Sequence, residues 1–360
     1  VFSLFCSSKR TTFSYSGMEL LDVESGLQEF TYEELQTLTD NFSEQNLIGR
    51  THFGQLYRAK IPQGWNGMEA QDDVTVKIWE NTAKILEGQV INRASPMETM
   101  ARMADEIAFL SHPSMNYHPN LVRVKGYCRK FNQLGVVFDL KSLDTVRNLA
   151  AKGSFKWLHR IKVALGLARL LEFLHDHQRG YLVRNISAAH IMLDQDFNPI
   201  LLDFAMLTGG VVGDKTKNEP FGPLFGSWGY IDPNFALIGK WTEKNDVFAF
   251  GVVLLELICK CAVDRVRNFK NTGYSFLHNR ACALYKNKKS RFAFGQSECS
   301  LVHKSFSEEP VFDARDGPII TKLAISCVDM SPKPRPTMKE VVKKLQALHI
   351  VRGHHDVLGV

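Results

Sequence analysis

This sequence of 360 residues has no large excess of positive or negative charge, few closely spaced cysteines and no long run of apolar residues. The 44 Lys and Arg residues face 38 Asp and Glu residues, so the net charge is only +6. Nucleic-acid-binding proteins usually carry a sharper and clustered basic excess. The most apolar run, residues 247–255, is far shorter than the roughly 20 residues that a membrane-spanning helix needs. We therefore expect neither a nucleic-acid partner nor a transmembrane helix.

The seven cysteines are scattered and odd in number. The one close pair, Cys259 and Cys261, has too few ligands for a zinc site. This usage favours a reducing, cytoplasmic compartment over a disulfide framework. Near the start, Cys6 stands beside Lys9 and Arg10. A palmitoylated Cys6 with these cations would hold the chain peripherally at the plasma membrane, and a frayed tail is the alternative.

One local basic excess lies in residues 260–304, where ten Lys and Arg residues meet two acids. Such a segment is either a solvated loop or a binding patch, and the sequence leaves both interpretations open.

Apolar residues make up 44% of the chain, enough to bury a sizeable core. Alternating apolar residues predict strands from residue 47 to residue 78, and Thr31 with Glu34 predicts a capped helix before them. The remaining expected elements are a helix over 97–111, strands over 121–126 and 134–140, and helices over 157–175, 246–258 and, as a pair, 319–348. We therefore expect an α+β, bilobal fold with a small, mainly β N-lobe containing one helix and a larger, mainly α C-lobe.

The predicted division is an N-terminal leader over 1–28, an N-lobe with its preceding short helix over 29–140, a C-lobe over 141–350 and a C-terminal tail over 351–360. A cleft between two such lobes is the usual place for a ligand.

Phosphoryl transfer needs backbone donors around the phosphates, a cation, metal ions and a carboxylate base. After the first strand, Gly49 and Gly54 fit the first and third glycines of G-x-G-x-x-G, with Thr51 at the second. The segment 74–77, V-T-V-K, then fits the strand lysine that holds phosphates, and Glu106 in the next helix is its candidate ion-pair partner.

Three further stretches are more specific: Phe30-Thr-Tyr-Glu-Glu-Leu35, Gly229-Tyr-Ile-Asp-Pro233 and Cys327–Met338. On these the chain resembles the plant receptor-like kinase family, including its cytoplasmic members, from about residue 30 to residue 348. The resemblance implies a nucleotide site formed by Gly49, Gly54, Leu56, Thr75, Lys77, Glu106, Phe138 and Met192. In it Phe138 is the gatekeeper, Met192 the floor under the adenine, and Thr75 replaces the family's alanine.

The catalytic loop departs from the family. Where the family has H-R-D-I-K-x-x-N, residues 183–190 read V-R-N-I-S-A-A-H. The base is replaced by Asn185, whose amide cannot take up the acceptor's proton. The lysine is replaced by Ser187, and the metal-binding asparagine by His190, a poorer ligand for Mg²⁺. Asp203 is retained as a metal ligand, and Arg184 as the arginine that reads an activation-loop phosphate.

The resemblance also implies several structural and regulatory roles. Asp246 anchors the catalytic loop, and Arg335 normally pairs with a glutamate where this chain has Asn234. The hydroxyl groups that could accept phosphate in the activation segment are those of Thr208, Thr216 and Ser227.

A general base contributes about 10²–10⁴ in rate and a placed cation roughly 10²–10³. We therefore expect a pseudokinase that acts as a scaffold or adaptor in plant immune or receptor signalling. It would bind an active kinase or an intracellular immune or receptor protein. Lys77, Glu106 and Asp203 predict weak binding of ATP with Mg²⁺. The alternatives are an active Ser/Thr kinase that uses the same three residues, and a decayed chain with a marginal fold.

Overall fold

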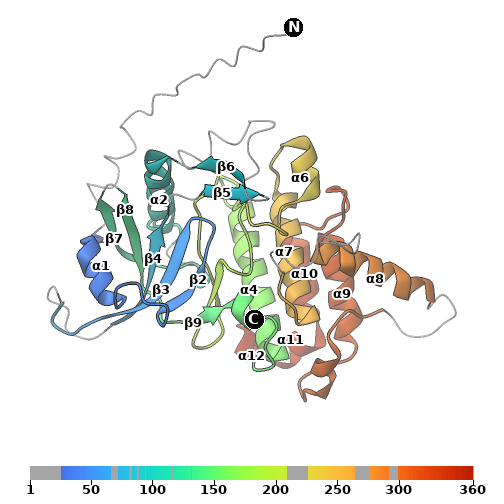
Figure 1. Cartoon of the computed structure of the whole chain (residues 1–360). Helices are drawn as coiled ribbons and strands as arrows, with labels where there is room; N and C mark the ends of the chain where they lie inside the picture. Colours follow the sequence, from blue (N-terminus) through green and yellow to red (C-terminus); the bar gives the residue numbers. More distant parts are fainter. Residues whose placement is uncertain are drawn as a thin grey trace, which may run out of the picture.

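The computed structural model describes residues 26–65, 72–80, 83–86, 89–93, 95–115, 117–130, 132–208, 226–263, 276–291 and 299–359. The predicted anchor residues Cys6, Lys9 and Arg10 and the hydroxyl of Thr216 lie outside these ranges, as does part of the basic segment 260–304. The described chain forms two lobes, a sheet-rich one and a helical one (Figure 1).

The N-lobe is built on a six-stranded sheet in the order β1-β7-β8-β4-β3-β2. Its strands are β1 (Gln28–Glu29), β7 (Val124–Lys130), β8 (Gln133–Phe138), β4 (Asp72–Trp79), β3 (Gly54–Ile61) and β2 (Leu47–Arg50). Only β1 with β7 is a parallel pair within this sheet. Helix α2 (Pro96–Leu110) packs on β7 and β8, and a separate hairpin joins β5 (Ala83–Leu86) to β6 (Gln89–Arg93).

Helix α1 (Tyr32–Leu38) begins at the predicted capping box. The Glu34 N–H donates to Thr31 Oγ1 over 3.1 Å, and the Thr31 N–H donates to Glu34 Oε2 over 2.7 Å. The helix buries Leu35 against β8, where a Cβ on Gly135 would lie 2.5 Å from a Leu35 methyl group. A glycine at 135 therefore lets α1 pack closely on the sheet.

The C-lobe surrounds helix α7 (Glu243–Cys259), which is buried without interruption from residue 245 to residue 258. The other helices are α3 (Val146–Leu149), α4 (Trp157–Asp176), α6 (Pro233–Ile238), α8 (Leu277–Arg291), α9 (Asp316–Cys327), α10 (Met338–Gln346), α11 (His349–Gly353) and α12 (His355–Leu358), with a 3₁₀ turn at Lys304–Glu308. Helix α4 packs against α7 and α10. None of the helices in the described ranges has the length and apolar character of a membrane-spanning segment.

A small sheet lies where the lobes meet. Strand β10 (Ile191–Asp194) pairs on one side with β9 (Ser142–Thr145) and on the other with β11 (Pro199–Leu201). Because β9 and α3 follow directly after β8, the chain passes from the N-lobe sheet to this small sheet within a few residues.

The sequence predicted most of the longer helices, but it missed α8 within the basic segment 260–304, and it misplaced two strand ends. The helices expected over 97–111, 157–175 and 246–258 and the pair within 319–348 are confirmed by α2, α4, α7, α9 and α10. The strand expected over 121–126 begins only at Val124. The strand expected over 134–140 ends at Phe138, where the Leu140 N–H turns back to the Phe138 carbonyl over 2.8 Å. The lobe boundaries at 140 and 350 remain predictions.

The region expected as a tail, 351–360, contains packed structure. Helix α12 buries Leu358, and Arg169 Nη1 on α4 donates to the Gly359 carbonyl over 2.6 Å. Helix α12 has only four residues, too few to show a helical period of apolar residues in the sequence.

The partner of Arg335 is a carboxylate that the sequence interpretation overlooked. Arg335 donates to both oxygens of Asp232, over 2.5 and 2.8 Å, and both side chains are fully buried. The Asn245 side chain donates to Asp232 as well, over 2.7 Å. The expectation that only Asn234 could meet Arg335 is therefore wrong, because an acid two residues earlier takes that place.

Candidate active site

Three charged side chains meet where the two lobes join. Lys77 Nζ on β4 lies 3.0 Å from Glu106 Oε2 on α2 and 3.0 Å from Asp203 Oδ1, and all three side chains have 0% exposure. The same ammonium lies 3.9 Å from the ring centre of Trp79, which shares its face of β4. The predicted Lys77–Glu106 pair is thus formed, and Asp203 completes a buried triad.

One cation between two buried carboxylates leaves their charges unequally balanced. Burial raises the pKa of Glu106, and Lys77 offsets only part of this effect. Burial also pushes the pKa of Asp203 upward, but the Lys77 ammonium bonded to Oδ1 opposes this effect, and that pKa lies below its ordinary value. Asp203 is therefore the ionised acid of the pair.

Two of the replaced catalytic-loop residues contact the other oxygen of Asp203. Asn185 Nδ2 donates to Asp203 Oδ2 over 3.1 Å, and His190 Nε2 lies 3.4 Å from the same atom. The backbone of Asp203 is left-handed, with φ of 73°, a conformation that aspartate tolerates better than most residues. The retained metal-type carboxylate is thus surrounded by groups of the protein itself.

His190 joins the catalytic loop to the phosphate loop. Its Nδ1 lies 2.6 Å from the Asn185 carbonyl, so Nδ1 carries a proton and donates. Its Nε2 accepts the backbone N–H of His52 over 3.2 Å, which fits a neutral ring.

The phosphate-loop amides are bonded within the protein. The Thr51 N–H donates to the Gly54 carbonyl over 2.8 Å, and the Phe53 N–H donates to Thr51 Oγ1 over 3.3 Å. Together with the His52 N–H, three successive donors are used where a phosphate would need them. Phe53 is buried against Trp79, with ring centres 6.0 Å apart, and the Arg102 guanidinium lies 5.2 Å from the Phe53 ring.

The base and lysine positions hold neutral, buried groups. Asn185 Oδ1 lies 3.4 Å from Ser227 Oγ, which donates to it. The Ser187 hydroxyl is buried and has no hydrogen-bond partner in the described part of the chain. Neither side chain supplies a base or a cation.

The residues expected around the adenine are all fully buried: Leu56, Thr75, Phe138 and Met192. Thr75 lies opposite Phe138 in the β4–β8 register. Its hydroxyl donates to the Leu140 carbonyl over 2.8 Å and lies 3.0 Å from Ser142 Oγ. Thr75 thus ties the sheet to the segment that leads into the C-lobe.

Gly49 and Gly54 lie where the chain approaches neighbouring strands closely. A Cβ on Gly49 would lie 3.3 Å from a methyl carbon of Thr145, and one on Gly54 would lie 2.0 Å from the Ile78 carbonyl. Asn148 Nδ2 on α3 donates to the Ile48 carbonyl over 2.8 Å. The β2 strand therefore lies directly on the C-lobe.

Asp246 and Arg184 have structural contacts. Asp246 accepts the backbone N–H groups of Val183 and Arg184, each over 2.8 Å, as the resemblance implied. Arg184 Nε donates to the Met206 carbonyl over 2.5 Å, and the side chain is buried. Thr208 is 4% exposed and accepts the Leu182 N–H over 2.7 Å, so its hydroxyl is not presented for phosphorylation in this structure.

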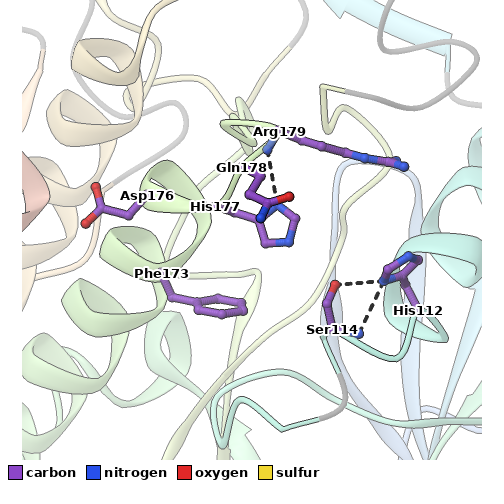
Figure 2. A pocket seen from close by; sticks show the side chains of 7 residues that line it. All are labelled: His112, Ser114, Phe173, Asp176, His177, Gln178 and Arg179. Carbon is purple, nitrogen blue, oxygen red and sulfur yellow. Dashed lines mark hydrogen bonds between the residues drawn. The ribbon is translucent and has the colours of Figure 1, made fainter.

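An open pocket lies elsewhere, between the end of α4 and the loop after α2 (Figure 2). Its lining is His112, Ser114, Phe173, Asp176, His177, Gln178 and Arg179. None of these belongs to the predicted site, and His112 Nδ1 lies 2.7 Å from Ser114 Oγ. Within the described ranges, no group of three or more His, Cys, Asp or Glu side chains is placed to hold a metal ion.

Sequence reasoning missed His52, Asn148 and Arg102. His52 acts through its backbone, so its side chain carried no signal, and Asn148 is linked to Ile48 only in three dimensions. Arg102 could have been found, because it lies four residues after Glu98 and four before Glu106 on one helix face. Its guanidinium bonds Glu98 over 2.8 Å and the Ala205 carbonyl over 2.8 Å.

As they stand, these residues do not fit an ATP–Mg²⁺ complex. The phosphates need the loop amides, and the metal needs the Asp203 carboxylate. Both sets of groups are already bonded within the protein. A nucleotide would have to break these contacts before it could bind.

The two lobes, the buried Lys77–Glu106 pair and the loop held by Asp246 define a protein of the kinase class. Residues 42–345 match the protein tyrosine and serine/threonine kinase family, and the chain belongs to that family. The predicted bilobal kinase fold is thereby confirmed.

Relatives place the chain close to plant receptor-like cytoplasmic kinases, as the sequence resemblance implied. The probable serine/threonine-protein kinase PBL16 of Arabidopsis thaliana is 30% identical over 89% of this chain and 72% of that protein. PBL7 of the same plant is 31% identical over 89% of this chain and 77% of its own length. The Arabidopsis receptor-like cytosolic serine/threonine-protein kinase RBK2 is 29% identical, covering 94% and 65%.

Proposed function

We propose that this chain is a pseudokinase of the plant receptor-like cytoplasmic kinase type, which transfers phosphate poorly or not at all and acts through protein partners. One observation carries the proposal. At the position of the catalytic base, Asn185 is buried and donates its amide to Asp203 over 3.1 Å. An amide in this position cannot take the proton of an acceptor hydroxyl.

The neighbouring replacements act in the same direction. Ser187 supplies no cation for the moving phosphoryl group, and His190 is turned toward Asp203 and His52. A lost base costs about 10²–10⁴ in rate and a lost electrostatic donor roughly 10²–10³. These losses are not strictly additive, but even the first alone would leave slow transfer.

The partners that this role requires are proteins: an active kinase, or an intracellular immune or receptor protein. The proposed location is cytoplasmic, which agrees with relatives whose names describe cytosolic or cytoplasmic kinases. Peripheral attachment at the plasma membrane through Cys6 is a further part of the proposal. The balanced charge of the chain gives no reason to add nucleic acid to this list.

The second candidate function is an active Ser/Thr protein kinase. It is favoured by the intact Lys77–Glu106–Asp203 triad and by relatives that are named as probable Ser/Thr kinases. It requires an acceptor hydroxyl to lose its proton directly to phosphate or water.

Transfer of labelled γ-phosphate separates the two candidates. The purified chain is incubated with labelled ATP, Mg²⁺ or Mn²⁺ and a general Ser/Thr protein substrate, beside the Lys77→Ala variant. The pseudokinase proposal predicts equal label in both samples. Label that is well above the Lys77→Ala level would support the active kinase.

A further inference from the structure

The β2–β3 ribbon of the N-lobe is bonded to the C-lobe at both of its ends. At its tip, the His52 N–H donates to His190 Nε2 over 3.2 Å. Near its base, Asn148 Nδ2 donates to the Ile48 carbonyl over 2.8 Å, and Arg58 Nη2 on β3 donates to the Leu143 carbonyl over 2.5 Å. These three bonds join the ribbon directly to the C-lobe.

We propose that this chain holds its lobes closed without nucleotide and that the closed arrangement excludes ATP–Mg²⁺. His190 is the latch: its Nε2 accepts the backbone N–H of His52, a hydrogen bond that a phosphate oxygen of the nucleotide would otherwise accept. This inference goes beyond the proposed function. A chain that bound ATP without transferring phosphate would leave the pseudokinase role intact and would overturn the latch.

The latch joins one residue that departs from the family, His190, to the amide that follows another, Thr51. Thr51 replaces a glycine of the phosphate loop, and its Oγ1 accepts the Phe53 N–H and donates to the Gly54 carbonyl over 3.2 Å. His190 replaces the asparagine of the catalytic loop and accepts the N–H between them, that of His52. A glycine at 51 has no hydroxyl for the first bond, and an asparagine at 190 is shorter than the imidazole that makes the second.

The metal position is filled in the same way. Asp203 binds Lys77 through Oδ1, and Asn185 Nδ2 donates to its Oδ2 over 3.1 Å. An aspartate at 185 would repel this carboxylate, whereas the amide donates to it. Two of the replacements that remove phosphoryl-transfer groups, Asn185 and His190, therefore also bond polar groups that a nucleotide–metal complex would use.

Closure preserves the arrangement that nucleotide would otherwise support. The Lys77–Glu106 pair is formed at 3.0 Å, and Phe204 packs on Phe109 of α2 with ring centres 4.8 Å apart. Arg102 on α2 also holds the Ala205 carbonyl over 2.8 Å. A partner would therefore meet one fixed kinase shape, whatever the nucleotide concentration.

Hydrogen–deuterium exchange of the whole chain tests the latch. The ribbon peptide covering residues 48–56 is followed with and without millimolar ATP and Mg²⁺, and the thermal midpoint is measured under both conditions. The wild-type chain is expected to exchange slowly in this peptide and to show no change in exchange or midpoint with ATP–Mg²⁺.

The variant His190→Asn removes the acceptor of the His52 N–H. We expect its ribbon peptide to exchange about tenfold faster, as an opening of the hydrogen bond predicts, and its midpoint to rise with ATP–Mg²⁺. The control His177→Asn changes a histidine in the pocket of Figure 2 and should behave as the wild type.

Two results would overturn the proposal. One is a rise in the wild-type midpoint with ATP–Mg²⁺, and the other is equal ribbon exchange in wild type and His190→Asn. If His190→Asn does not fold, the wild-type titration and the Asn148→Ala variant decide the matter, because loss of the second tie should also speed exchange in the ribbon.

Discussion

Asn185 and Asp203 are joined by a buried hydrogen bond of 3.1 Å between the side-chain amide and Oδ2. The bond links the position of the catalytic base to the position of the metal ligand. In a working kinase both positions carry acids, which a metal ion and substrate keep compatible. Here the first position carries an amide, which bonds the remaining acid, Asp203, without a metal ion or substrate.

Restoring the acid at 185 should therefore destabilise the chain in a pH-dependent way. In Asn185→Asp, two buried carboxylates face each other, which raises the pKa of one of them in the folded state. A raised folded pKa contributes stability at low pH that is lost as the pH rises through it. We expect a loss of about 2–3 kcal/mol at pH 8, and a clearly smaller loss at pH 5, in urea unfolding.

The control for this prediction is Asn185→Ala. It removes the same hydrogen bond without adding charge, so its loss should be nearly equal at the two pH values. Equal losses for Asn185→Asp at pH 5 and pH 8 would contradict the contact between residues 185 and 203.

Because Arg335 pairs with Asp232, substitutions at Asp232 and Asn234 should change the free energy of unfolding by very different amounts. In Asp232→Asn, the fully buried Arg335 loses its counter-charge, which typically costs about 3–5 kcal/mol. Asn234→Ala removes the residue at the family's glutamate position, which should change stability by no more than about 0.5 kcal/mol. Urea unfolding checks both, and the reverse order would show that Arg335 pairs with residue 234.

These unfolding curves also test whether the chain is a marginal, decayed copy. A single cooperative transition is expected of a chain with this continuous core, whereas a broad, non-cooperative loss of signal would favour decay.

The hydroxyl of Tyr230 is hydrogen-bonded to a buried acid of the C-lobe, Glu256. It donates to Glu256 Oε2 over 2.7 Å, and the Val263 N–H donates to Oε1 over 2.7 Å. Burial raises the pKa of Glu256 to about 7, and the Tyr230 hydrogen bond opposes that rise. Because the folded pKa is raised, stability from this group declines as the pH rises from about 4.5 to about 7.

Tyr230→Phe removes the donor that the ionised Glu256 needs most. We expect a loss of about 1–3 kcal/mol at pH 8 and a smaller loss at pH 5, where the acid is mostly protonated in the fold. Tyr57→Phe is the matched control, because its hydroxyl donates over 3.0 Å to the neutral Gln55 amide. A pH-independent loss in Tyr230→Phe would contradict the assignment.

Much of this fold could be predicted because its signals are local. The capping box at Thr31, the periodic helices and the alternating strands each depend on residues close in sequence. The motif spacing also predicted that Lys77 and Glu106 would pair, although they lie on separate elements, but it did not predict that Asp203 would contact Lys77.

The rest depended on contacts that sequence spacing does not encode. The bond from His52 to His190 joins a backbone amide to a side chain 138 residues away, and no residue pattern announces it. The pairing of Arg335 with Asp232 was not predicted, because the family motif places the partner of this arginine at position 234. Strand ends such as Phe138 depend on a local turn that apolar alternation does not show.

The initial rate of phosphate transfer tests the central claim most directly. The wild-type chain, Lys77→Ala and the triple variant Asn185→Asp/Ser187→Lys/His190→Asn are compared with labelled ATP, Mg²⁺ and a general Ser/Thr substrate. We expect the wild type to equal Lys77→Ala, and the triple variant, if folded, to exceed both, since it regains the base, the cation and the metal ligand. A wild-type rate tenfold or more above that of Lys77→Ala would contradict the pseudokinase account.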